Sequence, residues 1–131
     1  MPDSRTELIQ YRLDAAEEKW SAAQVLLESG NYKDSVGRSY YAMFSAVRAL
    51  LAKDNADFAK HSGVIAYFQR EYNKTDRIEK KYSKYLSEAF QIRNNCDYAD
   101  FYLIQKEDAA EQCQRAKEFI VAIREFLDMA L

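Results

Sequence analysis

Residues 32–53, YKDSVGRSYYAMFSAVRALLAK, are the stretch that decides the fold expected for this chain of 131 residues. Apolar side chains recur in it three and four positions apart, which is the period of an α-helix. The main apolar stripe consists of Val36, Tyr40, Met43, Val47 and Leu50. This stripe is widened around much of the helix by Tyr41, Phe44 and Leu51. A helix that is apolar on most sides lies at the centre of a bundle, so this segment predicts a central helix.

The composition favours an all-α fold with one domain. The chain has only 3 Gly and 1 Pro, and the proline is at position 2. β-Hairpins and β-sandwiches need many turn residues, so this composition argues against an all-β fold. A chain of this length corresponds to about one domain and buries about two-thirds of its unfolded surface. We therefore expect one helical domain over residues 1–131.

A long helix is predicted before the central one. Ser4 and Glu7 have the spacing of a capping box, in which each side chain satisfies the other residue's free backbone N–H. Apolar side chains then follow one helical face: Leu13, Ala16, Trp20, Ala23 and Leu27. Gly30 ends this helix, because glycine adopts the left-handed conformation of a C-terminal cap without strain. The expected helix therefore starts at Ser4 and ends at a tight turn.

Three further helices are predicted after a polar loop at residues 54–60. They are a short helix from Ser62 to Tyr72, a helix that fades near Cys96, and a last helix from about Glu107. Asp76 and Glu79 have capping-box spacing and predict the start of the second of these helices. The stretch 97–106 is aromatic and acidic and has no clear period. The fold class is thus all-α, with four to five helices.

The charge is small overall but unevenly distributed. The formal net charge is −2, which does not indicate a globally basic nucleic-acid-binding protein. Residues 31–93 are net basic, whereas both ends of the chain are acidic. Basic side chains gather on the fourth helix and just before it: Lys74, Arg77, Lys80, Lys81 and Lys84, with Arg77, Lys81 and Lys84 on one face. This group is either an ordinary solvated surface or a patch that contacts phosphates.

Several catalytic and metal-dependent classes lack the residues that they need. His61 is the only histidine, whereas zinc sites need three or four ligands and di-iron bundles need paired Glu-x-x-His motifs. The glycines are too dispersed for a phosphate-binding loop. Cys96 and Cys113 form no metal-type pair, and nothing in the sequence places either beside His61 as a nucleophile. We therefore expect no metal and no cofactor.

The sequence also predicts a cytoplasmic location without a membrane partner. Two cysteines without a pairing pattern are most simply reduced thiols of a cytosolic protein. The N-terminal Met-Pro-Asp-Ser-Arg is not followed by the apolar core of a signal peptide, so none is expected. No apolar run approaches the roughly 20 residues of a transmembrane helix.

Three groups of side chains are candidate site residues. Arg93 and Asp97 are four positions apart and can form an ion pair, either as a helix-end pair or as a group that orients a phosphate. His61, at the start of a helix, can contact a phosphate or a carboxylate, or can bond to the backbone. Tyr40 and Tyr41 point about 100° apart on a helix, so they are split between the core and an interface, or both pack in the core.

Three segments, in this order, resemble the HEPN domain family. Residues 38–51, RSYYAMFSAVRALL, resemble the signature of its second helix, and residues 60–65, KHSGVI, resemble the K-H-x-x-V/I start of the next helix. Arg93 with Asp97 and Tyr98 resembles the R-x-x-x-D-Y end of its fourth helix. The resemblance covers nearly the whole chain. It implies an up-and-down bundle of four to five helices, usually a homodimer.

The resemblance also implies a nucleotide or nucleic-acid context. Many prokaryotic members of the family pair with a minimal nucleotidyltransferase as the two halves of a toxin–antitoxin system. Active members are metal-independent ribonucleases that carry R-x(4–6)-H at a dimer cleft. There the histidine handles the 2′-OH proton or the leaving group, and the arginine stabilises phosphate charge.

This chain departs from that ribonuclease motif. Arg93 supplies the arginine, but residues 97–100 contain no histidine. Tyr98 stands where R-x4-H places the histidine, and a phenol with a pKa of about 10 is a poor base at neutral pH. Asp97 is a weak base as well, because an arginine partner lowers the pKa of a carboxyl group.

Three functions remain as hypotheses. The first is a non-catalytic HEPN-like protein of a toxin–antitoxin-type pair, which binds a nucleotidyltransferase partner or a nucleotide or RNA phosphate at a dimer cleft. Its candidate ligand-binding residues are Arg93, Asp97, Tyr98, His61, Arg38 and Tyr41. The second is a metal-independent ribonuclease that uses Arg93 with Tyr98, Asp97 or His61 as a non-standard acid or base. The third is a purely structural helical interaction module with tyrosines at its interface.

Overall fold

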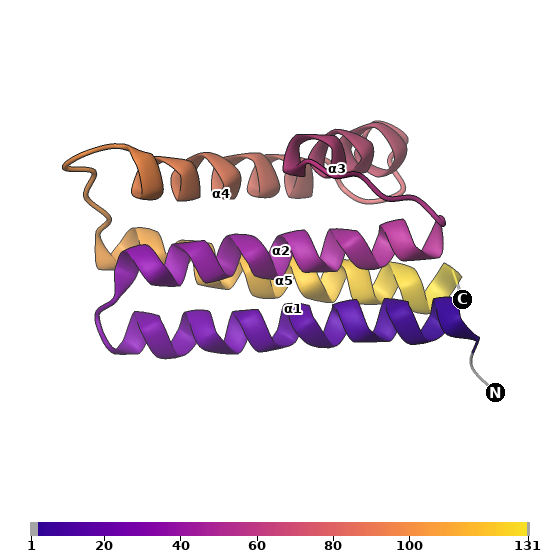
Figure 1. Ribbon diagram of the computed structural model, residues 1–131, viewed down its shortest axis with the longest axis horizontal. Helices are drawn as coiled ribbons and strands as arrows, with labels where there is room; N and C mark the ends of the chain where they lie inside the picture. Colours follow the sequence, from indigo (N-terminus) through magenta and orange to yellow (C-terminus); the bar gives the residue numbers. More distant parts are fainter. Residues whose placement is uncertain (1–2, 131) are drawn as a thin grey trace.

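The computed structural model describes residues 3–130, which form five α-helices and one π-helical turn and contain no strand. The elements are α1 (Ser4–Glu28), α2 (Tyr32–Lys53), α3 (His61–Phe68), η1 (Gln69–Asn73), α4 (Lys81–Tyr98) and α5 (Lys106–Ala130). The long helices α1, α2 and α5 lie side by side, and α4 runs along the bundle with α3 near its first residues (Figure 1). The predicted all-α bundle is confirmed.

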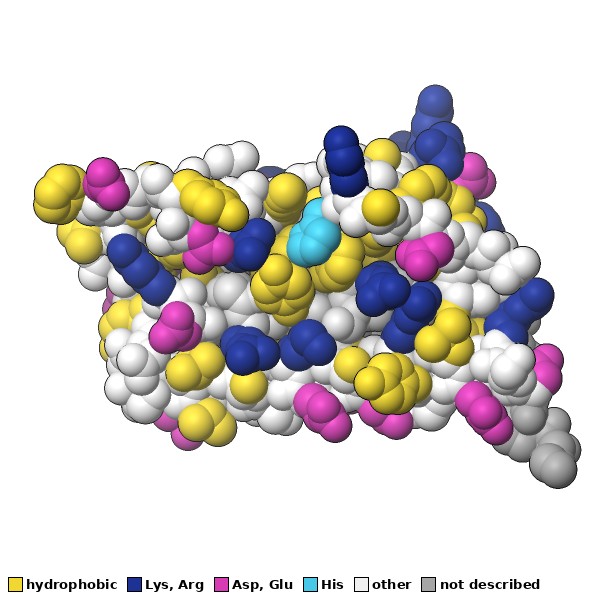
Figure 2. All heavy atoms as spheres, in the orientation of Figure 1, with side chains coloured by type: hydrophobic (Ala, Val, Ile, Leu, Met, Phe, Trp, Pro, Cys, Tyr) yellow, Lys and Arg dark blue, Asp and Glu magenta, His cyan; other side chains and the backbone are white. Residues whose placement is uncertain are grey.

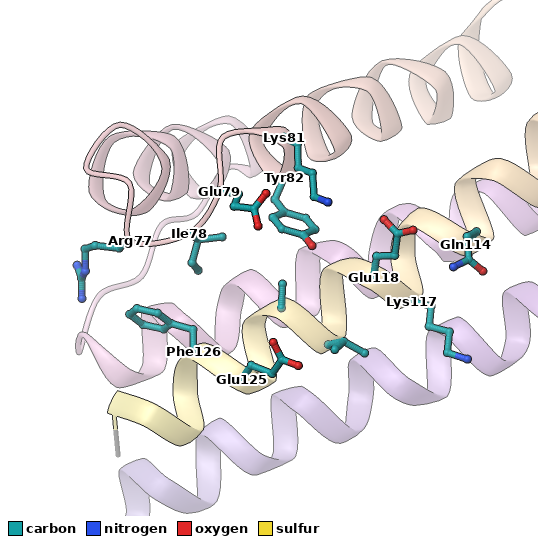
Figure 3. A pocket seen from close by; sticks show the side chains of 12 residues that line it. Arg77, Ile78, Glu79, Lys81, Tyr82, Gln114, Lys117, Glu118, Glu125 and Phe126 are labelled. Carbon is teal, nitrogen blue, oxygen red and sulfur yellow. The ribbon is translucent and has the colours of Figure 1, made fainter.

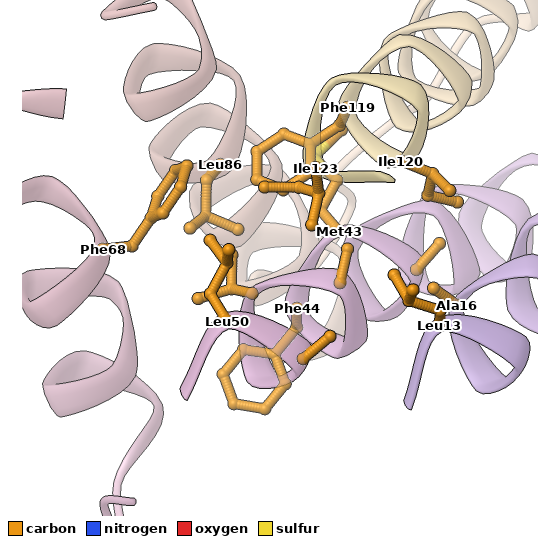
Figure 4. Close-up of a cluster of buried hydrophobic side chains, with 14 of the residues drawn as sticks. Leu13, Ala16, Met43, Phe44, Leu50, Phe68, Leu86, Phe119, Ile120 and Ile123 are labelled. Carbon is orange, nitrogen blue, oxygen red and sulfur yellow. The ribbon is translucent and has the colours of Figure 1, made fainter. Parts of the chain in front are cut away.

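α2 is the central helix, as its apolar circumference predicts. It contacts α1, α3, α4 and α5, and most of its side chains are buried. Figure 4 shows part of the resulting core, in which Met43 and Leu50 of α2 lie among side chains of the other helices. Tyr40 is fully buried in this core, whereas the neighbouring Tyr41 is half-buried. The two tyrosines are therefore split between the core and the surface.

The start of α1 differs from the sequence prediction in its cap. The helix begins at Ser4 as predicted, but the capping residue is Asp3, whose carboxylate accepts a hydrogen bond from the Thr6 N–H at 2.8 Å. The Ser4–Glu7 capping box is wrong, because Ser4 already has helical geometry and only the extended backbone of Asp3 aims a side chain at the free N–H groups.

The start of α4 also corrects the prediction. Asp76 does not cap it with Glu79: Asp76 has a left-handed backbone with a φ of 60° and lies in the turn before the helix. The buried amide of Asn73 holds this turn by donating to the carbonyl oxygens of Ile78 and Glu79 at 3.3 and 3.2 Å. α4 therefore begins only at Lys81, so Arg77 lies before it and does not share its face.

The short helix after the loop extends further than predicted at both ends. It begins at His61 rather than Ser62 and continues into the π-helical turn η1 as far as Asn73. Asp54, which follows α2, fastens this segment by accepting hydrogen bonds from the hydroxyls of Tyr67, at 2.8 Å, and of Tyr72. These contacts hold the end of α3 and the turn η1 against the end of α2, whereas His61 at the start of α3 meets α2 through Tyr40.

Candidate functional site

A pocket of about 440 Å³ opens where α1, α2 and α4 meet. Its lining consists of Leu26, Lys33, Asp34, Gly37, Arg38, Tyr41, Arg93 and Asp97. It thus brings together four of the residues that the sequence singled out: Arg38 and Tyr41 from α2, and Arg93 and Asp97 from α4.

Arg93 is held in this pocket by two contacts. Its Nε donates to Oδ2 of Asp97 at 2.9 Å, so the predicted ion pair along the helix is present. Its guanidinium carbon lies 5.3 Å from the centre of the Tyr41 ring, within the range of a cation–π interaction. The side chain is only 23% exposed. The outer nitrogen Nη1 makes only a long hydrogen bond, 3.4 Å, to Asn94. The guanidinium is therefore fixed in place while its outer edge remains available to an anion.

His61 lies beside this pocket although it is distant from Arg93 in the sequence. Its ring stacks on Phe44 with the ring centres 4.2 Å apart, and it meets the edge of Tyr41 at 5.8 Å. Tyr41 therefore contacts both His61 and Arg93. The hydrogen bond of the ring joins Nδ1 to the hydroxyl oxygen of Tyr40 at 2.8 Å, so the expectation of a backbone partner is not met.

The surroundings of His61 favour the neutral imidazole. Burial lowers its pKa below the usual 6.5, and the positive charges of Arg93 and Arg48 lower it further. Burial also raises the pKa of Tyr40, so its phenol stays protonated. If Tyr40 donates to Nδ1, the outer Nε2 of His61 carries a proton and is a donor; if Nδ1 donates to Tyr40, Nε2 is a free base. The site thus combines a fixed cation with a neutral imidazole.

Tyr98 does not belong to this constellation. It is the last residue of α4, its side chain is 79% exposed, and it does not line the pocket. The position at which the ribonuclease motif R-x4-H places its histidine is therefore directed to solvent here.

Sequence reasoning missed several residues near the site. Lys33, Asp34 and Gly37 line the pocket, and Arg48 adds positive charge near His61. The sequence does hold a signal for Lys33, Asp34 and Gly37. Each lies four positions before another pocket residue of α2 (Gly37, Arg38 and Tyr41, respectively), and residues four apart on a helix share a face. No comparable signal links Arg48 to His61, since their proximity depends on how α3 packs on α2.

The basic group before and along α4 is a solvated surface with local partners. Lys80 pairs with Asp76 at 3.7 Å and Lys84 with Glu88 at 3.8 Å. Arg77 lies over the Tyr72 ring at 4.4 Å. A pocket of about 540 Å³ between this region and α5 has three basic side chains and three carboxylates in its lining (Figure 3). Its balanced charge favours the ordinary surface over the phosphate-contacting patch.

The thiols and carboxylates form no further reactive centre. Cys96 is half-buried, Cys113 is buried, and neither forms a disulfide; burial raises the pKa of both thiols. Within residues 3–130 no group of three or more His, Cys, Asp or Glu side chains is arranged to hold a metal ion. None of the described helices is long and apolar enough to cross a membrane.

The comparisons with known proteins point to one family. Residues 9–126 match the model of the HEPN domain. The chain belongs to the HEPN family. This HEPN protein is 32% identical to a UPF0332 protein of Thermotoga maritima over 126 residues, which cover 96% of each chain. It is 34% identical over 121 residues to "Putative toxin MJ0605" of Methanocaldococcus jannaschii, with 92% of this chain and 90% of the relative covered. A third relative, "Putative toxin MJ0142" of the same archaeon, is 32% identical over 91% of this chain and 81% of its own.

Proposed function

We propose that this HEPN protein is the phosphate-binding half of a toxin–antitoxin-type pair and holds a nucleotide or RNA without cleaving it. The observation that carries the proposal is the fixed guanidinium of Arg93 in a pocket that also contains Lys33 and Arg38. A half-buried arginine whose position is set by a carboxylate and an aromatic ring loses little entropy on binding, and its planar edge fits a phosphate.

Two findings support the biological setting of this proposal. Two relatives carry the printed name "Putative toxin". The family resemblance implies a homodimer whose two sites lie close together at the dimer cleft, and a minimal nucleotidyltransferase as the partner. We extend both to this chain as part of the proposal.

The lack of cleavage follows from the residues near Arg93. The family motif needs a histidine after four to six intervening residues, and the three positions where it would stand hold Tyr98, Ala99 and Asp100 instead, with the side chain of Tyr98 directed to solvent. Asp97 is engaged by Arg93, because its Oδ2 accepts from the guanidinium at 2.9 Å.

A metal-independent ribonuclease is the second candidate, and one observation favours it. His61 and Arg93 both contact Tyr41, so a histidine and an arginine meet in space even though the sequence motif is missing. The lowered pKa keeps His61 neutral at pH 7, as a general base requires. In this alternative His61 takes the 2′-OH proton and Arg93 stabilises the phosphorane charge.

One experiment separates the two functions. Purified protein is mixed with a fluorescently labelled RNA oligonucleotide in EDTA, and both binding, by anisotropy, and cleavage, on a gel, are followed. We expect binding without cleavage, with affinity at least tenfold weaker for Arg93→Ala and unchanged for Arg124→Ala. Arg124 is a matched control, because it is a half-exposed arginine that pairs with Glu17 on α1.

The other outcomes are equally decisive. RNA cleavage that both Arg93→Ala and His61→Ala abolish would establish the ribonuclease. Wild-type protein that neither binds nor cleaves RNA or a mononucleotide would contradict both functions and leave the structural interaction module.

A further inference from the structure

A second basic pocket lies between α1 and α2, outside the Arg93 site. It has a volume of about 310 Å³ and is lined by Leu8, Tyr11, Arg12, Ala15, Lys19, Ser45 and Arg48. Three of these described residues are cations and none is a carboxylate. The nearby Asp57 lies 3.9 Å from Arg48 and is 64% exposed, so it neutralises the group only in part. The pocket of Figure 3, by contrast, has as many carboxylates as cations.

The guanidinium of Arg12 is held close to Arg48. Nη1 of Arg12 donates to the backbone oxygen of Arg48 at 2.8 Å, which holds the Arg12 guanidinium against α2. Burial lowers the pKa of Arg12, and the charge of Arg48 lowers it further. Two like charges held together are unfavourable in the free protein, and a bound anion relieves this repulsion.

The second pocket and the Arg93 pocket both lie along the boundary between α1 and α2. Arg12, Lys19 and Leu26 are seven positions apart on one face of α1; the first two line the second pocket and the third lines the Arg93 pocket. On α2, one face carries Arg38 and Tyr41 at the Arg93 end and Ser45 and Arg48 at the other. The helices run side by side in opposite directions (Figure 1), so these two faces meet along the same boundary.

The boundary between the two pockets is long enough for more than one phosphate. Arg38 and Arg48 are ten residues apart on α2, which corresponds to about 15 Å along the helix axis. Lys and Arg side chains form a band along this face of the molecule, over α2 and its boundary with α1 (Figure 2). The net charge of the whole chain is −2, so this band of Lys and Arg side chains is a local excess of positive charge on a slightly acidic molecule.

We propose that the pocket formed by Arg12, Lys19 and Arg48 binds a second phosphate of the single-stranded nucleic acid whose first phosphate contacts Arg93. The aromatic ring of Tyr11, which is 72% exposed at the edge of this pocket, stacks on the adjacent base. Cations that follow a backbone together with an exposed aromatic ring are the combination that single-stranded nucleic acids need. The inference rests on the proposed function, because it assumes that Arg93 binds a phosphate.

The test compares a long with a short ligand. Anisotropy titrations use a labelled 12-nucleotide oligouridylate, and UMP binding is measured by calorimetry. The variants are Tyr11→Ala, Lys19→Glu and Arg48→Glu; the control is Lys117→Glu, which makes the same charge change on α5. We expect each of the three variants to weaken oligouridylate binding about tenfold, with UMP binding unchanged in Tyr11→Ala and Lys19→Glu, which lie away from the Arg93 site, and Lys19→Glu to reduce the salt dependence by about one unit of slope. Arg93→Ala weakens both ligands.

Each remaining result overturns a defined part of this inference. The second site would be rejected if the affinity for oligouridylate fell equally in Lys19→Glu, Arg48→Glu and the control Lys117→Glu. The proposed function would stand in that case, provided that Arg93→Ala still weakened binding. Equally tight binding of a duplex of the same length would reject a single strand as the ligand. No binding of either ligand by the wild-type protein would reject the proposed function together with the inference.

Discussion

At the scale of single residues, the site depends on Tyr41, which contacts both His61 and Arg93. The ion pair of Arg93 with Asp97 was predictable, because residues four apart on a helix are neighbours whatever else the chain does. The approach of His61 to Arg93 does not follow from spacing, since it depends on the packing of α3 against α2 and α4. Only the family resemblance placed the two residues in one candidate site.

The first prediction concerns the protonation of His61. We expect its pKa, followed by NMR, to lie below 6.5 in the wild-type protein and to rise in Arg93→Ala, because a nearby positive charge is removed. The rise is partial, since burial is the larger cause and stays. Because the folded-state pKa is lowered, His61 contributes stability above pH 6.5 that is lost as the pH falls through the folded-state pKa. A pKa that is identical in both proteins would show that Arg93 does not act on the imidazole.

At the scale of the elements, periodicity predicted more than local capping signals did. The bounds of α2 match the prediction at both ends, since its apolar pattern runs unbroken from the turn at Gly30 to the polar loop after Lys53. The capping-box predictions failed at α1 and α4, because the box spacing occurs wherever Ser or Asp precedes Glu by three residues. Whether it is used depends on backbone geometry, and Asp76 in particular is left-handed.

The second prediction tests the observed cap of α1. Replacing Asp3 by Ala removes the acceptor for the Thr6 N–H, so we expect a lower midpoint of thermal unfolding. Ser4→Ala is the matched control, because Ser4 is already inside the helix, and its midpoint stays at the wild-type value. Circular dichroism melts measure both. If Ser4→Ala were the more damaging change, the original capping box would be the correct description.

The third prediction concerns Asp54, which ties the end of α2 to α3 and η1. Burial alone would raise its pKa, but hydrogen bonds from Tyr72, Tyr67 and Lys53 outweigh this effect, and the pKa is lowered. A carboxyl group whose pKa is lowered by folding stabilises the fold at pH values above its unfolded-state pKa, which is near 4. This contribution is lost as the pH falls through the folded-state pKa. We expect Tyr72→Phe to cost about 1–3 kcal/mol in urea unfolding at pH 7 and less at pH 3.

The control for this prediction is Tyr82→Phe. Tyr82 is a half-buried tyrosine that packs on Phe119, and its hydroxyl does not bond to Asp54. Its loss of stability should be smaller and should not change between pH 7 and pH 3. A pH-independent loss for Tyr72→Phe would show that the hydroxyl acts by packing rather than through the carboxylate.

At the scale of the whole molecule, the sequence predicted the fold class better than the site. An apolar central helix and few turn residues suffice for an all-α bundle, because they determine which faces must be buried. The concentration of positive charge along the boundary between α1 and α2 was not predictable in the same way. Arg48 is far from Arg12 and Lys19 in the sequence, and only the antiparallel packing of the two helices brings the three together.

The fourth prediction tests whether α2 carries the stability of the whole bundle. Leu50 is fully buried where α2 meets the other helices, and removing its side chain leaves a cavity that a packed core closes only in part. We expect Leu50→Ala to lower the free energy of unfolding by about 2–5 kcal/mol. Val25→Ala is the control, because Val25 is 64% exposed on α1, and its effect should stay within about 0.5 kcal/mol.

Urea titrations followed by circular dichroism at α-helical wavelengths and by tryptophan fluorescence measure both variants. Since Trp20 lies on α1 and donates to the backbone of Cys113 on α5, the fluorescence reports a contact between two helices that flank α2. If loss of Leu50 loosens the entire bundle, both signals shift to the same lower urea concentration. Separate transitions in Leu50→Ala would mean that α1 and α5 hold together without an intact α2, and α2 would not be the organising element.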